Sequence, residues 1–145
     1  MGLNPGRKNR NLADMSDYEP EVYHPPPAKD CEIDEHTFVI NGPLRGHFRA
    51  HHYQGKVVDF SFSLVHDQHI RNDGNLVRAD CDHGCVHRHR YLKDGSDVLG
   101  GHTGKDAISI PPGPDGYDLV HQQYDEQYAW VFENVDQHLE RWRSS

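Results

Sequence analysis

Long hydrophobic runs are missing from this sequence, and apolar residues are scarce overall. Apolar side chains make up 34% of the 145 residues, and the mean hydropathy is -0.90. No run is long enough for a signal peptide or a membrane-spanning helix, so we expect no membrane partner. The length suits one domain with a modest core, and part of the chain is expected to lie outside that core.

Cysteine and net positive charge are also in short supply. Three cysteines are an odd number without a disulfide pattern, which predicts a reducing, cytoplasmic compartment. The sequence contains 15 Lys and Arg and 23 Asp and Glu, which give a net charge of -8. This negative charge argues against duplex DNA as a partner. The 13 histidines could reverse this sign in mild acid, because thirteen added charges would bring -8 to +5.

The pattern of apolar residues predicts an α+β fold, an antiparallel meander of four or five strands with one long C-terminal helix packed on one face. The expected strands cover residues 36–40, 44–52, 56–65, 76–82, 85–92 and, as a short addition, 107–110. The helix is expected over residues 118–142 with Asp118 as N-cap. Its apolar stripe consists of Val120, Tyr124, Tyr128, Val131, Val135, Leu139 and Trp142. This stripe packs on the sheet or, in the alternative, pairs with a second copy of the helix.

Residues 1–34 are predicted to form an extended or disordered arm, ahead of a single domain at 35–145. The arm includes Pro20, Pro25, Pro26 and Pro27, and its apolar residues follow no period. Composition favours a loosely tethered tail. The alternative is a strap that becomes ordered on a protein partner through Tyr18, Val22 and Tyr23.

Ionisable side chains are concentrated in residues 76–92, which read LVRADCDHGCVHRHRYL. We expect a hairpin that turns at His83-Gly84, because glycine accepts the positive φ of a tight turn. Side chains alternate across a strand, so one face would be mostly apolar and the other would face water or a ligand. The polar face would carry Arg78, Asp80, Asp82, Cys85, His87 and His89.

These residue types suit RNA cleavage without a metal ion. His87 and His89 would act as base and acid, and Asp80, opposite His87, would fix its tautomer and raise its pKa. Arg78 would bind phosphate, with Arg88 and Arg90 nearby but on the other face.

Two other interpretations of the hairpin remain open. Cys81, His83 and Cys85 have the donor types that zinc prefers, although both cysteines could bind one ion only if residues 81–85 form a knuckle. His87 and His89 with Asp80 form a weaker candidate set for a metal. Otherwise the charged groups form structural pairs on a solvated sheet, and no cofactor is required.

The run Arg78-x-Asp80-x-x-His83-Gly84-x-x-His87-x-His89, preceded by a strand, resembles a pattern in small uncharacterised bacterial and phage domains. It is also similar to the TumE-type toxin family of bacterial toxin–antitoxin pairs, over residues 57–91. The resemblance implies a compact α+β domain whose functional residues are Arg78, Asp80, His87 and His89. Cys81 and Asp82 stand where that family's pattern has residues of the Asn-Ala-Pro kind.

The residues and the resemblance together predict a small bacterial or phage protein of the toxin–antitoxin type that acts on RNA. The alternative is a non-enzymatic interaction or assembly protein that contacts its partner through the N-terminal arm and the C-terminal helix.

Overall fold

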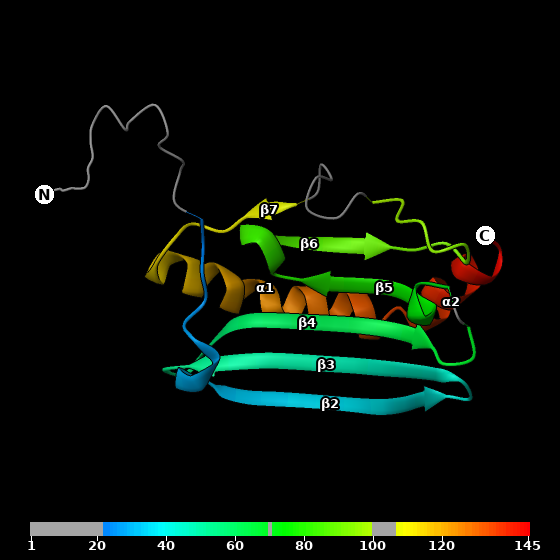
Figure 1. Ribbon diagram of the computed structural model, residues 1–145, viewed down its shortest axis with the longest axis horizontal. Helices are drawn as coiled ribbons and strands as arrows, with labels where there is room; N and C mark the ends of the chain where they lie inside the picture. Colours follow the sequence, from blue (N-terminus) through cyan, green and yellow to red (C-terminus); the bar gives the residue numbers. More distant parts are fainter. Residues whose placement is uncertain (1–21, 70, 100–106) are drawn as a thin grey trace, which may run out of the picture.

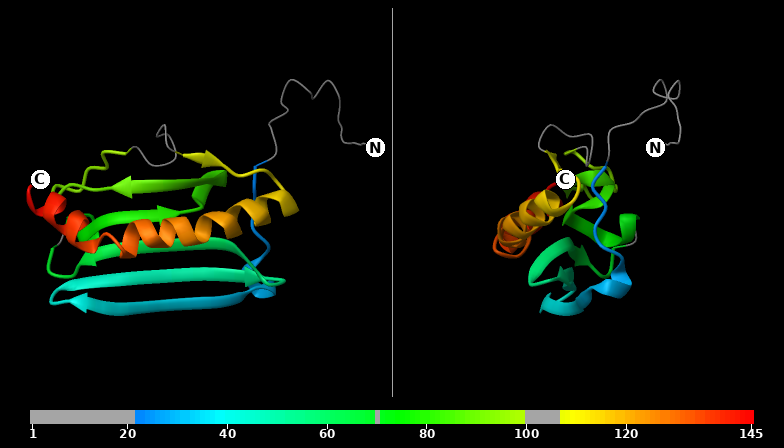
Figure 2. Two further views of the ribbon diagram at one scale, coloured as in Figure 1. Left: turned by 180° about the vertical axis from the view of Figure 1, so that it is seen from behind. Right: turned by 90° about the vertical axis from the view of Figure 1, so that its left-hand side faces the viewer.

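The computed structural model describes residues 22–69, 71–99 and 107–145. A six-stranded antiparallel sheet runs in chain order, and two helices cover one of its faces (Figure 1, Figure 2). The strands are β2 (Glu32–Asn41), β3 (Leu44–Tyr53), β4 (Lys56–His66), β5 (Asn75–Asp80), β6 (Cys85–Arg90) and β7 (Ile108–Ser109). The helices are α1 (Pro114–Phe132) and α2 (Val135–Arg143), and short 3-10 turns lie at Ala28–Asp30, Arg71–Gly74 and Asp82–Gly84. The expected α+β class and antiparallel meander are confirmed.

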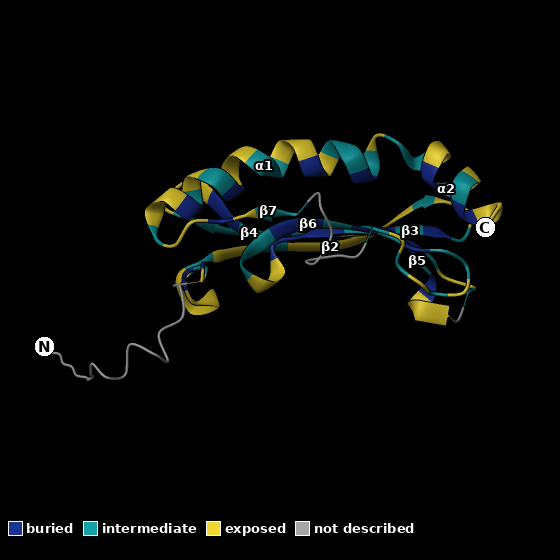
Figure 3. Ribbon diagram, turned by 90° about the horizontal axis from the view of Figure 1, so that it is seen from above, coloured by how far each residue is buried: buried dark blue, intermediate teal, exposed yellow. Residues whose placement is uncertain are grey.

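The two faces of the sheet differ in chemistry. Phe60 and Phe62 of β4 are fully buried, and the Phe62 ring lies 5.6 Å from that of Tyr124 in α1. Seen along the sheet, both helices lie on this apolar side (Figure 3). Because side chains alternate along a strand, residues 59, 61 and 63 of β4 point to the opposite side, which is polar.

The single helix expected over residues 118–142 is two helices. The first begins four residues earlier than expected, at Pro114, where proline is well tolerated because its missing N–H would be unpaired anyway. It ends before Asn134, whose side-chain Nδ2 donates to the carbonyls of Ala129 and Trp130. Neither helix among the described residues combines the length and apolar content needed to cross a bilayer.

The apolar stripe of the helices belongs to this chain's own core. Val120, Val131 and Trp142 are buried in the cluster that also contains the β4 phenylalanines. The stripe therefore packs on the sheet, and the alternative of a helix pair with a second copy through this stripe is wrong.

The predicted boundary of the N-terminal arm is only partly right. Residues 32–34, assigned to the arm, are the first residues of edge strand β2. Tyr23 is buried, and its hydroxyl donates to the Val58 carbonyl at 2.6 Å, whereas Val22 is exposed. Tyr18 and the rest of the arm to residue 21 lie outside the described residues.

The short strand expected at residues 107–110 is β7, which pairs with β6 and extends the sheet to six strands. In the strand order of the sheet, the polar hairpin of β5 and β6 is flanked by β4 on one side and β7 on the other.

Candidate functional site

The β5–β6 hairpin has the predicted register. Asp80 lies opposite His87, and Arg78 lies opposite His89. His83 and Gly84 have φ values of 60° and 75°, and the Cys85 N–H donates to the Asp82 carbonyl. Positive φ at both central residues is the geometry that matches the twist of a tight hairpin.

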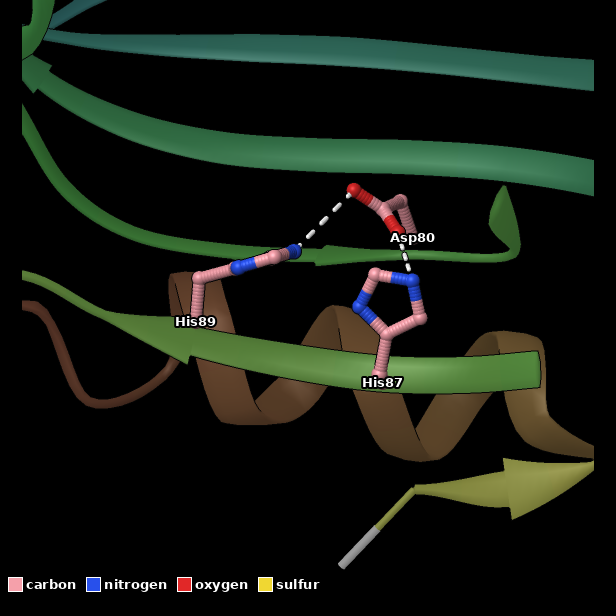
Figure 4. A group of neighbouring side chains, drawn as sticks. All are labelled: Asp80, His87 and His89. Atoms are coloured by element: carbon pink, nitrogen blue, oxygen red, sulfur yellow. Dashed lines mark ion pairs between the residues drawn. The ribbon is translucent and has the colours of Figure 1, made fainter. Parts of the chain in front are cut away.

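Asp80 lies at the centre of a cluster of cationic and imidazole side chains. Its Oδ1 is 3.0 Å from His87 Nε2, and its Oδ2 is 3.6 Å from His89 Nε2 (Figure 4). Arg78 Nε is 2.8 Å from Asp80 Oδ2. The structure thus brings together all four site residues that the sequence predicted.

The cluster is more buried than expected. Asp80 is 1% exposed and His87 3%, so the prediction of a solvated sheet face is wrong at these positions. They do not lie beneath the helices, because their neighbours Ala79 and Val86 occupy the helix side of the same strands. The side chain of Arg78 is 35% exposed and is the part of the cluster that reaches solvent.

Asp97 is a member of the site that the sequence did not reveal. Its Oδ2 is 2.8 Å from His89 Nδ1, and its Oδ1 accepts from the backbone N–H groups of Arg90 and Leu99. The only local signal was an aspartate in a glycine-rich loop. A single β-bridge between Tyr91 and Asp97 folds that loop back onto the end of β6.

The carboxylates determine the charge on the histidines. Burial alone lowers the pKa of His89, but its hydrogen bonds with Asp80 and Asp97 outweigh burial and raise it above its ordinary value. Burial alone raises the pKa of Asp80, yet hydrogen bonds from both histidines and the charge of Arg78 hold it well below its usual range. Near neutral pH, Asp80 is therefore a carboxylate and His89 is more often protonated than a free histidine.

The tautomer of His87 follows from its two acceptors. Its Nε2 lies 3.0 Å from Asp80 Oδ1 and 3.2 Å from the Asp82 carbonyl oxygen. Both partners accept hydrogen bonds, so the proton belongs on Nε2 and the basic lone pair belongs on Nδ1.

A metal ion has one candidate position among the described residues. Donor atoms of Asp80, His87 and His89 all lie within 4.8 Å of one another, a spacing that a divalent ion could bridge. The set expected from Cys81, His83 and Cys85 does not come together: within the described ranges none of the three belongs to a group of this kind. Cys81 is buried in the core cluster, where burial raises its pKa well above the ordinary value.

Arg88 and Arg90 lie on the helix side of the sheet, as the alternation predicted. The Arg88 guanidinium lies 4.6 Å from the centre of the Trp130 ring, and its Nε donates to Gln127. These two arginines therefore cannot join Arg78 in binding a phosphate held at the histidines.

Comparisons with protein-family models, with curated proteins and with solved structures return no match for this chain.

Proposed function

We propose that this chain cleaves RNA by acid–base catalysis at the site formed by Arg78, Asp80, His87 and His89, as a toxin of a toxin–antitoxin pair. The supporting observation is a buried carboxylate shared by two imidazoles, with a guanidinium at its solvent side. Groups of this kind meet the needs of phosphodiester transfer: a base, an acid and a positive charge for the transition state. The resemblance to TumE-type toxins adds the expectation that expression inhibits growth.

Each residue has one role in the proposed reaction. His87, with its proton held on Nε2 by Asp80, accepts the 2′-hydroxyl proton at Nδ1. O2′ then attacks phosphorus and forms a 2′,3′-cyclic phosphate, while the bond to O5′ breaks and O5′ takes a proton from His89. Arg78 neutralises charge on the phosphate oxygens, and Asp97 holds His89 in its protonated form.

The strands beside the hairpin offer polar groups along the same face. In the strand register, Arg49 of β3 lies opposite Ser61 of β4, and Ser61 lies opposite Asp80 of β5. Arg49 also forms an ion pair with Asp59 at 3.0 Å. A strand of RNA lying across β3–β5 would therefore meet hydroxyl and guanidinium donors, which suit phosphate and ribose contacts.

Burial of the histidines sets a condition on this activity. A substrate can reach His87 only when the groups that cover it move, since its side chain is almost wholly inaccessible. We therefore expect slow cleavage whose rate depends on local opening near the Arg78 end of the site.

The direct test is cleavage of a single-stranded RNA by the full chain. We expect a 2′,3′-cyclic phosphate product, and we expect His87→Gln and His89→Gln to lower the rate by at least about 100-fold, the contribution typical of a general acid or base. The matched control is His36→Gln, an exposed histidine of β2 that lies opposite Phe48 on the helix side of the sheet, which should leave the rate unchanged. A substrate with 2′-O-methyl groups should resist cleavage. Circular dichroism would verify that each variant folds.

Three outcomes would overturn the proposal: no cleavage by the wild-type chain, equal cleavage of the 2′-O-methyl substrate, or full activity in both histidine variants. A chelator distinguishes metal-free cleavage from cleavage that requires a divalent ion. Metal-free acid–base cleavage continues in its presence, whereas the metal-dependent reaction stops. Growth on induced expression gives a cellular readout, in which wild type should inhibit growth and the His87 variant should not.

One observation favours the alternative of a non-enzymatic interaction protein. Strand β2 is at the edge of the sheet, and it exposes Ile33 and Val39, which are 50% and 64% accessible. An exposed apolar edge can pair with a strand from another protein. If RNA cleavage fails, Val39→Lys is the variant with which to test a protein contact, because a lysine on an edge strand opposes pairing.

A further inference from the structure

A second polar site lies on the helix side of the sheet, away from Asp80. A cavity of about 290 Å³ opens where β6 meets the junction of α1 and α2. It is lined by Arg90, Trp130, Asn134, Gln137, His138 and Arg141. Arg90 follows His89 in β6, so its side chain points to the opposite face from the histidine cluster.

The two arginines of this cavity have no acidic partner within the described ranges. Among the residues that the structure describes, no carboxylate lies within ion-pair distance of Arg90 or Arg141. The Nε atoms of both arginines are buried and make no hydrogen bond to a described residue. Both guanidinium groups line the same cavity, and burial together with the charge of Arg90 lowers the pKa of Arg141.

His138 at the cavity wall responds to the same positive field. Burial lowers its pKa, and the charges of Arg141, Arg90 and Arg88 lower it further. Its hydrogen bond to the Trp130 carbonyl, at 2.7 Å, raises the pKa, but by less than the other causes lower it. Arg90 and Arg141 in one cavity therefore form a local excess of positive charge in a chain whose net charge is -8.

Arg141 is held in place by the ends of two strands. Its NH1 and NH2 donate to the carbonyls of Tyr91 and Leu76, at 3.2 and 3.5 Å. These bonds fix the guanidinium before any ligand arrives, which lowers the entropy lost on binding. Like charges that are partly buried destabilise a folded protein, and an anion between the two guanidinium groups would reduce that cost.

We infer that this cavity binds a phosphate group, held between the guanidinium groups of Arg90 and Arg141. Guanidinium donors match phosphate oxygens in geometry and stay charged, which makes arginine pairs suited to phosphate recognition. The cavity approaches the lower size of small-molecule sites, about 300 Å³, so it has room for part of the molecule that carries the phosphate. The site is independent of the proposed RNA cleavage, because it shares no side chain with Asp80, His87 or His89.

The test is calorimetric titration of the full chain with inorganic phosphate, 5′-AMP and adenosine in low salt. We expect phosphate and 5′-AMP to bind at one site per chain and adenosine not to bind. Tighter binding of 5′-AMP would identify a nucleotide as the carrier, and equal binding would identify the free anion. Arg90→Gln should weaken phosphate binding by about 10- to 100-fold, as expected for a lost charge-assisted hydrogen bond.

Arg45→Gln is the matched control, since Arg45 lies on the other face and is paired with Asp67 at 2.8 Å. It should bind phosphate as the wild type does. Thermal unfolding gives a second readout: without ligand, Arg90→Gln should melt at or above the wild-type temperature because it relieves repulsion with Arg141. The inference is overturned if the wild type binds no phosphate, if acetate binds as tightly, or if Arg90→Gln binds phosphate unchanged.

Discussion

At the residue scale, Asp80 shows how a buried carboxylate can remain charged. Desolvation favours its protonated form, but two imidazoles and a guanidinium within 3.6 Å favour the charged form more strongly. The resulting contribution to stability is present above the ordinary carboxyl pKa of about 3.9 and is lost as the pH falls below that value.

His89 should respond in the opposite direction, because its pKa in the folded protein is raised. Its contribution to stability is fully present below the unfolded pKa of about 6.5 and is lost as the pH rises through the folded value. Asp97→Asn should lower the pKa of His89 and so make the loss of stability with rising pH smaller. NMR titration of the His89 ring between pH 5 and 9 measures the pKa directly.

Asp94→Asn is the control for this prediction, because Asp94 lies in the same loop but bonds Ser96. It should leave the His89 titration unchanged. An unaltered His89 midpoint in Asp97→Asn would contradict the conclusion that Asp97 raises the pKa of His89.

At the scale of elements, the connection between β4 and β5 determines how the site strand enters the sheet. Gly74 has φ +76°, and a Cβ there would lie 2.1 Å from the His66 carbonyl oxygen. Backbone atoms cannot move aside cheaply, so Gly74→Ala combines a left-handed strain of about 1–2 kcal/mol with a steric clash. We expect a loss of unfolding free energy clearly greater than that strain, measured by urea denaturation.

Gly42 provides the matched comparison for Gly74. It has φ +55°, in the turn between β2 and β3, and no atom lies within 4 Å of a Cβ built there. Gly42→Ala should therefore show the strain alone, about 1–2 kcal/mol. Equal losses in the two variants would contradict the steric argument.

At the scale of the whole molecule, charge opposes the proposed binding of RNA at neutral pH and favours it in mild acid. The chain has 13 histidines and a net charge of -8 with all of them neutral. Affinity for single-stranded RNA, measured by fluorescence anisotropy, should rise between pH 7.5 and 6 and fall with added salt.

His47 offers a check on the origin of this pH dependence. It is an exposed histidine of β3 on the polar face, so His47→Gln should reduce the gain in affinity at pH 6. Affinity that is independent of both pH and salt would argue against a role for histidine charge in binding.

The polar hairpin and the fold class could be predicted from local sequence patterns alone. The alternation of side chains along residues 76–92 predicted that His87 and His89 share one face, and Gly84 predicted the turn. Both features follow from local strand and turn geometry. The helical stripe likewise followed from a period of 3.6. The break at Asn134 was missed because it depends on one side chain capping the carbonyls at the end of α1, which periodicity does not report.

The surroundings of the hairpin, in contrast, depend on contacts between residues that are far apart in the chain. Asp97 joins His89 because a loop folds back along β6, and Arg90 and Arg141 share a cavity although 51 positions separate them in the chain. Burial of Asp80 and His87 likewise depends on the assembled fold. Such contacts bring together residues from separate elements, so a local pattern could give the face of each side chain but neither its partners nor its exposure.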